Sequence, residues 1–185
     1  AGPDQNDLLT LESESNLYDD YTQFLNPDGL QGKRIGFYTG PMGNHFRVDT
    51  LMYETIRTLE DLGATVIEIE DITQENIGGD AFQVLLYEFK DGLNDYLESL
   101  NNDAIINSIE EMAEQIKASD NVPAPFDYNL ILMAAEMDGL DSEEYQNARE
   151  RMLRVSREEG IDRVMEENDL DALVSPTGSP AWETD

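Results

Sequence analysis

The chain has 185 residues and no cysteine, so we expect one domain with an ordinary core and exclude disulfides, thiolate zinc sites and a cysteine nucleophile. It carries 41 acidic residues against 11 basic ones, a formal net charge of -30, and such a surface repels both nucleic acid and anionic membranes. The acid-rich, lysine-poor composition suits a saline cytoplasm or habitat, a cytoplasmic location is expected, and no apolar run is long enough to span a bilayer.

Residues 1–30 are predicted to form a lead-in connector to a single α/β domain over residues 31–185. Most of the connector is acidic and polar, and a short helix is expected near Tyr18 to Leu25, where its aromatic anchors lie. The stretch Asn26-Pro-Asp-Gly-Leu-Gln-Gly32 is a cluster of turn-forming residues. The regular fold is therefore expected to begin after this cluster.

A strand, a helix and a second strand follow in close succession. Arg34 to Thr39 and Ala64 to Glu70 are short apolar stretches typical of strands. Between them, apolar residues recur at helical spacing from Val48 to Leu62, and Gly63 is placed to end the helix as its C′ residue. Two strands joined by one crossover helix at these lengths predict a right-handed parallel βαβ unit.

Three helical segments are expected next. Ala81 to Leu100 has a broad apolar stripe, for which packing in the core is the expected role. The stripe contains Phe82, Leu85, Leu86, Phe89, Leu93, Tyr96, Leu97 and Leu100. Asn101 to Lys117 contains an amphipathic segment, and Tyr128 to Met137 is a short helix that ends at Gly139.

A longer helical pattern runs from Ser142, a good N-cap residue, to Asn168. Its apolar residues form two sets on nearly opposite faces: Tyr145, Ala148, Met152 and Val155, and then Ile161, Val164 and Met165. Gly160 lies between the two sets. We therefore expect either a break at Gly160 or a change of packing partner there. A short strand from Ala172 to Ser175 follows.

The residue types that build common catalytic centres are scarce. His45 is the only histidine, so clusters of metal-binding imidazoles are excluded, and we expect it at the surface or capping a helix. The chain has no G-x-S-x-G motif, and carboxylates are too numerous to single out an acid–base pair. The loop Gly40-Pro-Met-Gly43 lacks a phosphate-binding pattern and is expected to be a plain turn. We predict no metal, no cofactor and no catalytic residue in this chain.

Several separated stretches resemble the amidase signature family, in the order found in that family. They are Leu86-Tyr-Glu-Phe-Lys90 with Leu93-Asn-Asp-Tyr-Leu97, the Tyr145-x-x-Ala148 helix, Glu159-Gly-Ile-Asp-x-x-Met165, and Leu170-Asp-Ala-Leu-Val-Ser-Pro-Thr177. The resemblance implies the C-terminal half of such an enzyme. It also implies an α/β fold in which helices cover a small mixed sheet containing the parallel βαβ unit. The parent protein would hydrolyse carbon–nitrogen amide bonds.

The family's two catalytic serines lie in a Gly/Ser-rich stretch that nothing in this chain resembles, and none of the three lysines lies in a context that matches the family's lysine base. The catalytic triad is therefore expected before Ala1, the N-terminal remainder of the same enzyme is an expected partner, and this chain alone should be inactive. The turn Ser175, Pro176, Thr177 and Gly178 is expected near the cleft for a small-molecule amide substrate, since open α/β sheets bind ligands where strands end. A plain strand end stopped by proline is the alternative.

Two other functions remain open from the sequence. The chain could be a stand-alone α/β domain that binds a small ligand, or a protein-interaction module whose helices expose an apolar face. Dimerisation at physiological salt would favour the interaction module. A gene that continues upstream with a lysine and a Gly/Ser-rich segment would favour the amidase interpretation.

Overall fold

A computed structural model of the protein describes residues 3–5, 8–13, 17–73, 75–100, 105–119 and 128–180. By its contacts the chain divides into two compact units. The first is built from residues 1–37, 41–68 and 171–185, and the second from residues 38–40 and 69–170. The predicted division into a connector over residues 1–30 and one domain over residues 31–185 stays a prediction.

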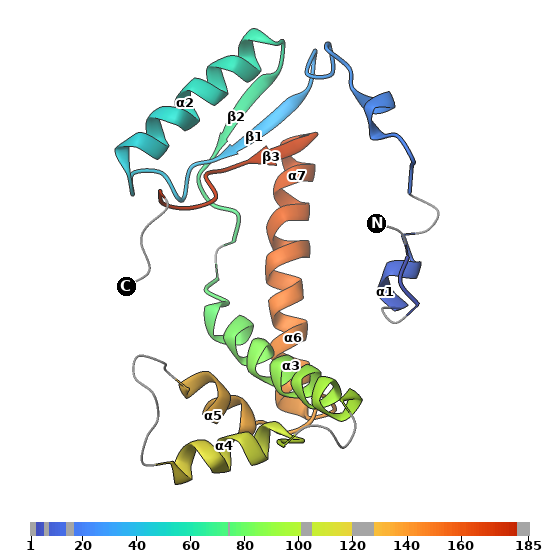
Figure 1. Cartoon of the computed structure of the whole chain (residues 1–185). Coiled ribbons are helices and arrows are strands. Elements are labelled where there is room, and N and C mark those ends of the chain that lie inside the picture. Colours follow the sequence, from blue (N-terminus) through green and yellow to red (C-terminus); the bar gives the residue numbers. More distant parts are fainter. Residues whose placement is uncertain are drawn as a thin grey trace. The chain divides into compact units, whose positions relative to one another are not determined.

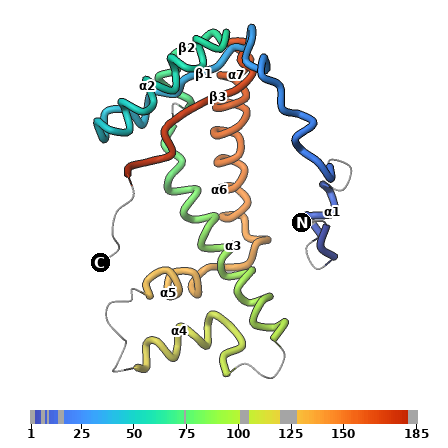
Figure 2. Tube along the Cα trace, turned by 45° about the horizontal axis from the view of Figure 1, so that its top comes forward, coloured from blue at the N-terminus to red at the C-terminus, as the bar shows by residue number. Residues whose placement is uncertain are grey.

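The first unit contains a three-stranded sheet and one long helix (Figures 1 and 2). Its elements are α1 (Leu8–Leu11), the 3-10 helix η2 (Tyr21–Phe24), β1 (Arg34–Tyr38), α2 (Phe46–Asp61), β2 (Thr65–Ile69) and β3 (Ala172–Val174). The strand order is β2-β1-β3, so β1 is central. The short helix expected within the connector is present as η2, whereas α1 was not predicted.

All three strands run in the same direction. Ile35 lies opposite Ala172 and Phe37 opposite Val174 in the parallel pair of β1 and β3. Between β1 and β2, the Thr65 N–H donates to Lys33 O at 2.8 Å, and the Thr39 N–H donates to Ile69 O at 2.9 Å. The first bond joins the starts of the two strands and the second joins their ends. The strands are therefore parallel, as the sequence predicted.

Helix α2 packs on the sheet through aromatic contact. The Phe37 side chain is 2% exposed, and its ring meets that of Tyr53 edge-on with 6.5 Å between centroids. Gly63 has a φ of 92° and follows the last turn of α2, as predicted for a C′ glycine. The crossover helix thus contacts the central strand of the sheet through an aromatic pair.

The second unit is helical. Its elements are α3 (Gly78–Ser99), α4 (Ile109–Ala118), α5 (Asn129–Ala135), α6 (Glu143–Leu153), the π-helical segment η4 (Arg154–Asp162) and α7 (Arg163–Glu167). Helix α3 contacts α4, α5 and α6, and two apolar clusters form at these contacts. Val84, Tyr87, Tyr145 and Ala148 form the first cluster, and Leu86, Ile109 and Ala134 form the second.

The long helical pattern begins and breaks where the sequence indicated. The Tyr145 N–H donates to Ser142 Oγ at 3.3 Å, so Ser142 is the N-cap of α6. Gly160 has non-helical φ and ψ angles of -108° and -105°, which place a kink there. Tyr145 packs with α3, whereas Val164 is buried and Ile161 is 47% exposed. A different packing partner for the second apolar set stays a prediction.

The prediction that the apolar stripe of α3 packs in the core is wrong for much of its length. Leu86 and Leu97 are buried as expected. The exposed members are Phe82, Leu85, Phe89, Tyr96 and Leu100, with exposed fractions between 39% and 58%. The period of the pattern identified the helix correctly, but the neighbouring helices cover a different side of it.

Candidate functional site

The site residues predicted from the sequence form the turn that follows β3. Pro176 is buried, whereas Ser175, Thr177 and Gly178 are exposed. The Ser175 hydroxyl donates to Pro176 O at 3.3 Å. The turn therefore anchors its proline in the unit and presents small polar groups to the solvent.

Asp171 fixes the strand that carries this turn. Its carboxylate accepts hydrogen bonds from Lys33 Nζ at 2.6 Å and from the Arg34 N–H at 2.9 Å. Its own N–H donates to Arg34 O at 2.8 Å. The hydrogen bond from Lys33 is the main reason that the pKa of Asp171 lies below its ordinary value of 3.8, with a further contribution from the Arg34 N–H. These bonds fix the register of β3 against β1.

The loop after β1 leaves the same edge of the sheet as the turn after β3, because parallel strands end together (Figure 1). His45 is the N-cap of α2, since its Nδ1 accepts from the Arg47 N–H at 3.3 Å, so the prediction of a capping role is confirmed. The Gly43 N–H donates to Asp49 Oδ1 at 3.0 Å. An anion at this helix end would meet the Asp49 carboxylate, so the loop does not suit phosphate.

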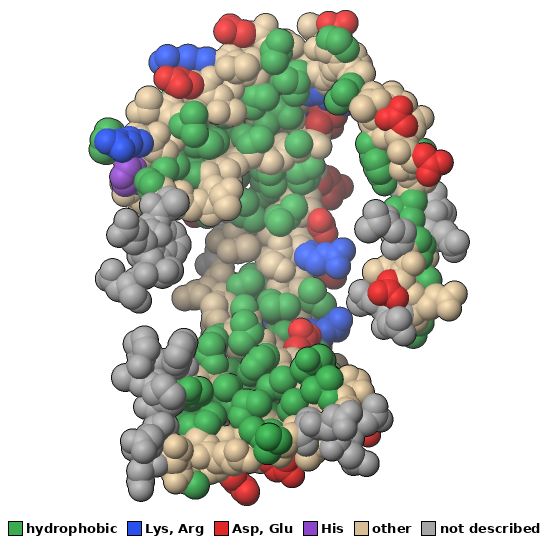
Figure 3. Space-filling view, in the orientation of Figure 1, with side chains coloured by type: hydrophobic (Ala, Val, Ile, Leu, Met, Phe, Trp, Pro, Cys, Tyr) green, Lys and Arg blue, Asp and Glu red, His purple; other side chains and the backbone are tan. Residues whose placement is uncertain are grey.

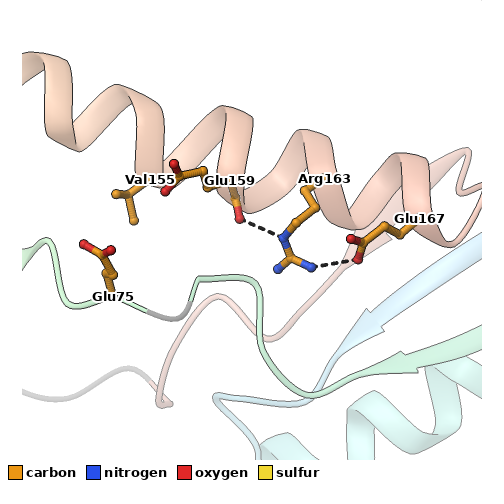
Figure 4. Close-up of a pocket in the computed structure, with 5 residues that line it drawn as sticks. All are labelled: Glu75, Val155, Glu159, Arg163 and Glu167. Atoms are coloured by element: carbon orange, nitrogen blue, oxygen red, sulfur yellow. Dashed lines mark hydrogen bonds and ion pairs between the residues drawn. The ribbon is translucent and has the colours of Figure 1, made fainter.

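A cavity of about 570 Å³ lies in the second unit beside the kinked helix (Figure 4). Glu75, Val155, Glu159, Arg163 and Glu167 line it. Arg163 Nε donates to Glu159 O at 2.9 Å, and Nη1 donates to Glu167 at 2.7 Å. The Glu75 and Glu159 carboxylates, which also line the cavity, are paired with Arg151 and Arg154.

Sequence reasoning missed this cavity. Its walls come from segments far apart in the chain, and Arg163 Nη2 also donates to Ile72 O at 3.2 Å. The one local signal was Gly160, because a kink next to a π-helical segment displaces side chains from their regular helical positions. A glycine at this position indicates a bend in the helix. It does not predict which residues from other segments, such as Glu75, line the cavity beside that bend.

The three lysines are all held by carboxylates. Lys33 Nζ lies 2.6 Å from Asp171, Lys90 Nζ lies 2.7 Å from Glu110, and Lys117 Nζ lies 3.8 Å from Glu136. The expectation that no catalytic base lies in this chain stays a prediction.

The described residues contain no group of three or more His, Cys, Asp or Glu side chains arranged to hold a metal ion. No helix in the described part of the chain combines the length and apolar character needed to cross a bilayer.

Comparison with known proteins identifies the family. The Amidase family model matches residues 2–185. A probable amidase from Arabidopsis thaliana is 34% identical over 168 residues, which are 84% of this chain and 30% of that protein. The native peptide amidase from Stenotrophomonas maltophilia has 33% identity and a TM-score of 0.82 over 98% of this chain and 37% of its own. An amidase family protein from Bacillus anthracis has 26% identity and a TM-score of 0.70, covering 94% of this chain and 34% of its own.

The chain thus spans about a third of the length of these relatives. The match extends over nearly the whole chain, and it includes the sheet, the crossover helix and the kinked helix rather than one shared motif. The fold implied by the family resemblance is therefore confirmed, with the three strands described here all parallel. The chain belongs to the amidase family.

Proposed function

We propose that this chain is the C-terminal part of an amidase that hydrolyses the carbon–nitrogen bond of linear amides. It would supply scaffold and part of the wall of the substrate cleft, while the catalytic serines and lysine belong to the rest of the enzyme. The observation that carries this proposal is the likeness to a solved peptide amidase over 98% of the chain, with 33% identity and a TM-score of 0.82.

The proposed wall is the turn Ser175, Pro176, Thr177 and Gly178. It is supported by its place at the carboxyl end of β3, where open parallel sheets bind ligands, and by the exposure of its polar residues. A stand-alone domain that binds a ligand or a partner without catalysis is less favoured, because the family match extends over the whole fold.

The relatives support one class of substrate for this proposal. A related peptide amidase has been crystallised with the competitive inhibitor chymostatin, so peptide amides are the first substrates to test. The partner of this chain would be the N-terminal remainder of the same enzyme. The strongly acidic composition favours a saline cytoplasm as its location.

This chain alone should hydrolyse neither amides nor esters. An unactivated serine hydroxyl is a weak nucleophile, and a positioned base typically contributes about 10²–10⁴-fold. The purified chain and the full-length gene product should be assayed against aryl esters, aryl amides and a peptide amide. We expect turnover, and its inhibition by chymostatin, only with the full-length protein.

Two variants sharpen this test. In the full-length protein, Thr177→Trp should raise KM for the peptide amide about tenfold or more, because the bulky ring would fill part of the proposed cleft. Thr58→Trp on the exposed side of α2 is the control and should leave KM unchanged. Turnover by the chain alone that disappears in Ser175→Ala would show that the catalytic serine lies here, against the proposal.

A further inference from the structure

One face of helix α3 carries no charged residue. At 3.6 residues per turn, ten residues of the helix and its C-cap fall within about 120° of the helix surface. They are Gly78, Ala81, Phe82, Leu85, Phe89, Gly92, Leu93, Tyr96, Ser99 and the C-cap Leu100. We call them the uncharged face of α3. The charged residues of the helix all lie outside this arc: Asp80, Glu88, Lys90, Asp91, Asp95 and Glu98.

This face is also exposed. Phe82, Leu85, Phe89, Tyr96 and Leu100 have exposed fractions of 42%, 49%, 39%, 58% and 39%. Figure 3 shows hydrophobic side chains gathered over this part of the second unit. With 41 acidic residues in 185, a face of this size would carry about two carboxylates at the chain's average content. An uncharged, aromatic-rich surface on so acidic a protein is typical of an interface.

The helices of the second unit already cover the other sides of α3. Val84 and Tyr87 pack against α6, and Leu86 packs against Ile109 of α4 and Ala134 of α5. Leu93, at one edge of the uncharged face, packs against this second cluster, and the exposed members of the face form a further side of the helix. Leaving it in water would forgo the favourable free energy of burying its apolar area.

We propose that the uncharged face of α3 is the surface on which the rest of the amidase polypeptide packs, and this inference rests on the proposed function. The first argument is length, because the chain covers only 37% of the solved peptide amidase, which leaves most of such an enzyme to supply a partner. A segment of the same polypeptide also meets this face at a high effective concentration.

The second argument is charge. A second copy of this chain would bring another net charge of -30 to the same contact. At physiological ionic strength the Debye length is about 8 Å, so much of that repulsion survives between surfaces in contact. The occupant should therefore present an apolar surface with few carboxylates, and an intramolecular segment meets that requirement more readily than a copy of this chain.

Cysteine accessibility tests the inference, because this chain has no cysteine of its own. Leu85→Cys places a thiol on the uncharged face. Ile105→Cys is the matched control, since Ile105 is a 92% exposed aliphatic residue in the same unit. Each variant is made in the full-length gene product and in this chain alone. The rate of maleimide labelling at each position is then measured by mass spectrometry, before and after unfolding in urea.

In the full-length protein, Leu85→Cys should react at least about 100-fold more slowly than after unfolding, while Ile105→Cys should react at a similar rate in both states. In the chain alone, both thiols should react rapidly. Equal labelling of the two thiols in the folded full-length protein would overturn the inference. So would protection of Leu85→Cys that appears only when light scattering shows a dimer and that disappears on dilution.

The same samples separate this inference from the proposed function. Protection of Leu85→Cys in a full-length protein that hydrolyses no amide would support the interface while the proposed activity fails. Rapid labelling of Leu85→Cys in an active amidase would contradict the proposed interface, while the proposed activity would be supported.

Discussion

Gly160 shows how one residue determines a bend in a long helix. A Cβ at this position would lie 2.6 Å from Val155 O and 3.1 Å from the Thr73 side chain. Contacts with backbone at that distance force a shift in the structure. We expect Gly160→Ala to lower the free energy of unfolding by about 1–3 kcal/mol, measured by urea denaturation.

Gly92→Ala is the matched control for this prediction. Gly92 lies within α3, and a Cβ there would meet no atom within 4 Å. The same substitution should therefore raise stability by about 0.5–1 kcal/mol, because alanine loses less backbone entropy on forming a helix. If both variants were more stable than the wild type, the prediction that a Cβ at Gly160 makes a destabilising contact would be wrong.

Asp171 should make stability depend on pH. Its pKa is lowered in the folded chain, chiefly by the hydrogen bond from Lys33, so its contribution is present above pH 3.8 and is lost as the pH falls through the lower folded value. We expect Asp171→Asn to be less stable than the wild type at pH 5–7, and the difference to shrink in the acid range. Lys33→Met should abolish most of that pH dependence, and a difference that grows on acidification would contradict this account.

At the scale of elements, α3 organises the second unit through polar contacts as well as apolar ones. Lys90 Nζ lies 2.7 Å from the Glu110 carboxylate at the start of α4. It also donates to Met137 O at 2.6 Å and to Ala135 O at 3.4 Å at the end of α5. One ammonium group, 19% exposed, thus connects three helices.

Lys90→Met keeps the apolar stem of the side chain and removes these bonds. We expect it to lower the free energy of unfolding by about 1–3 kcal/mol, since it leaves carbonyl groups of a partly buried helix end without a donor. Lys117→Met is the control, because the ion pair with Glu136 is exposed at both ends and should contribute less than about 0.5 kcal/mol. Equal losses in the two variants would mean that Lys90 acts only as a surface charge.

At the scale of the whole molecule, the net charge of -30 should make folding depend on salt. The Debye length falls from roughly 30 Å at 0.01 M ionic strength to about 3 Å at 1 M. We therefore expect the melting temperature at pH 7 to rise with sodium chloride over that range. Near pH 4.1, the isoelectric point of the sequence, the rise should largely vanish. A flat or falling melting temperature at pH 7 would contradict this prediction.

The sequence by itself determined the features that local chemistry controls. The spacing of apolar residues located the strands, the crossover helix and the long helical segments. Single residues marked element ends, as with Ser142 at the start of α6 and Gly63 after α2, because caps and left-handed turns depend on side chains within a few positions. The order of the family's motifs was enough to predict the fold to which they belong.

Only the tertiary structure decided which surfaces are covered. Apolar periodicity shows that a helix has an apolar side, but it does not say what packs against that side. The neighbours of α3 therefore left Phe89 and Tyr96 exposed, although the sequence predicted both in the core. The cavity beside the kinked helix was hidden for the same reason, since Glu75 and Arg163 are far apart in the chain and line one cavity only in the folded structure.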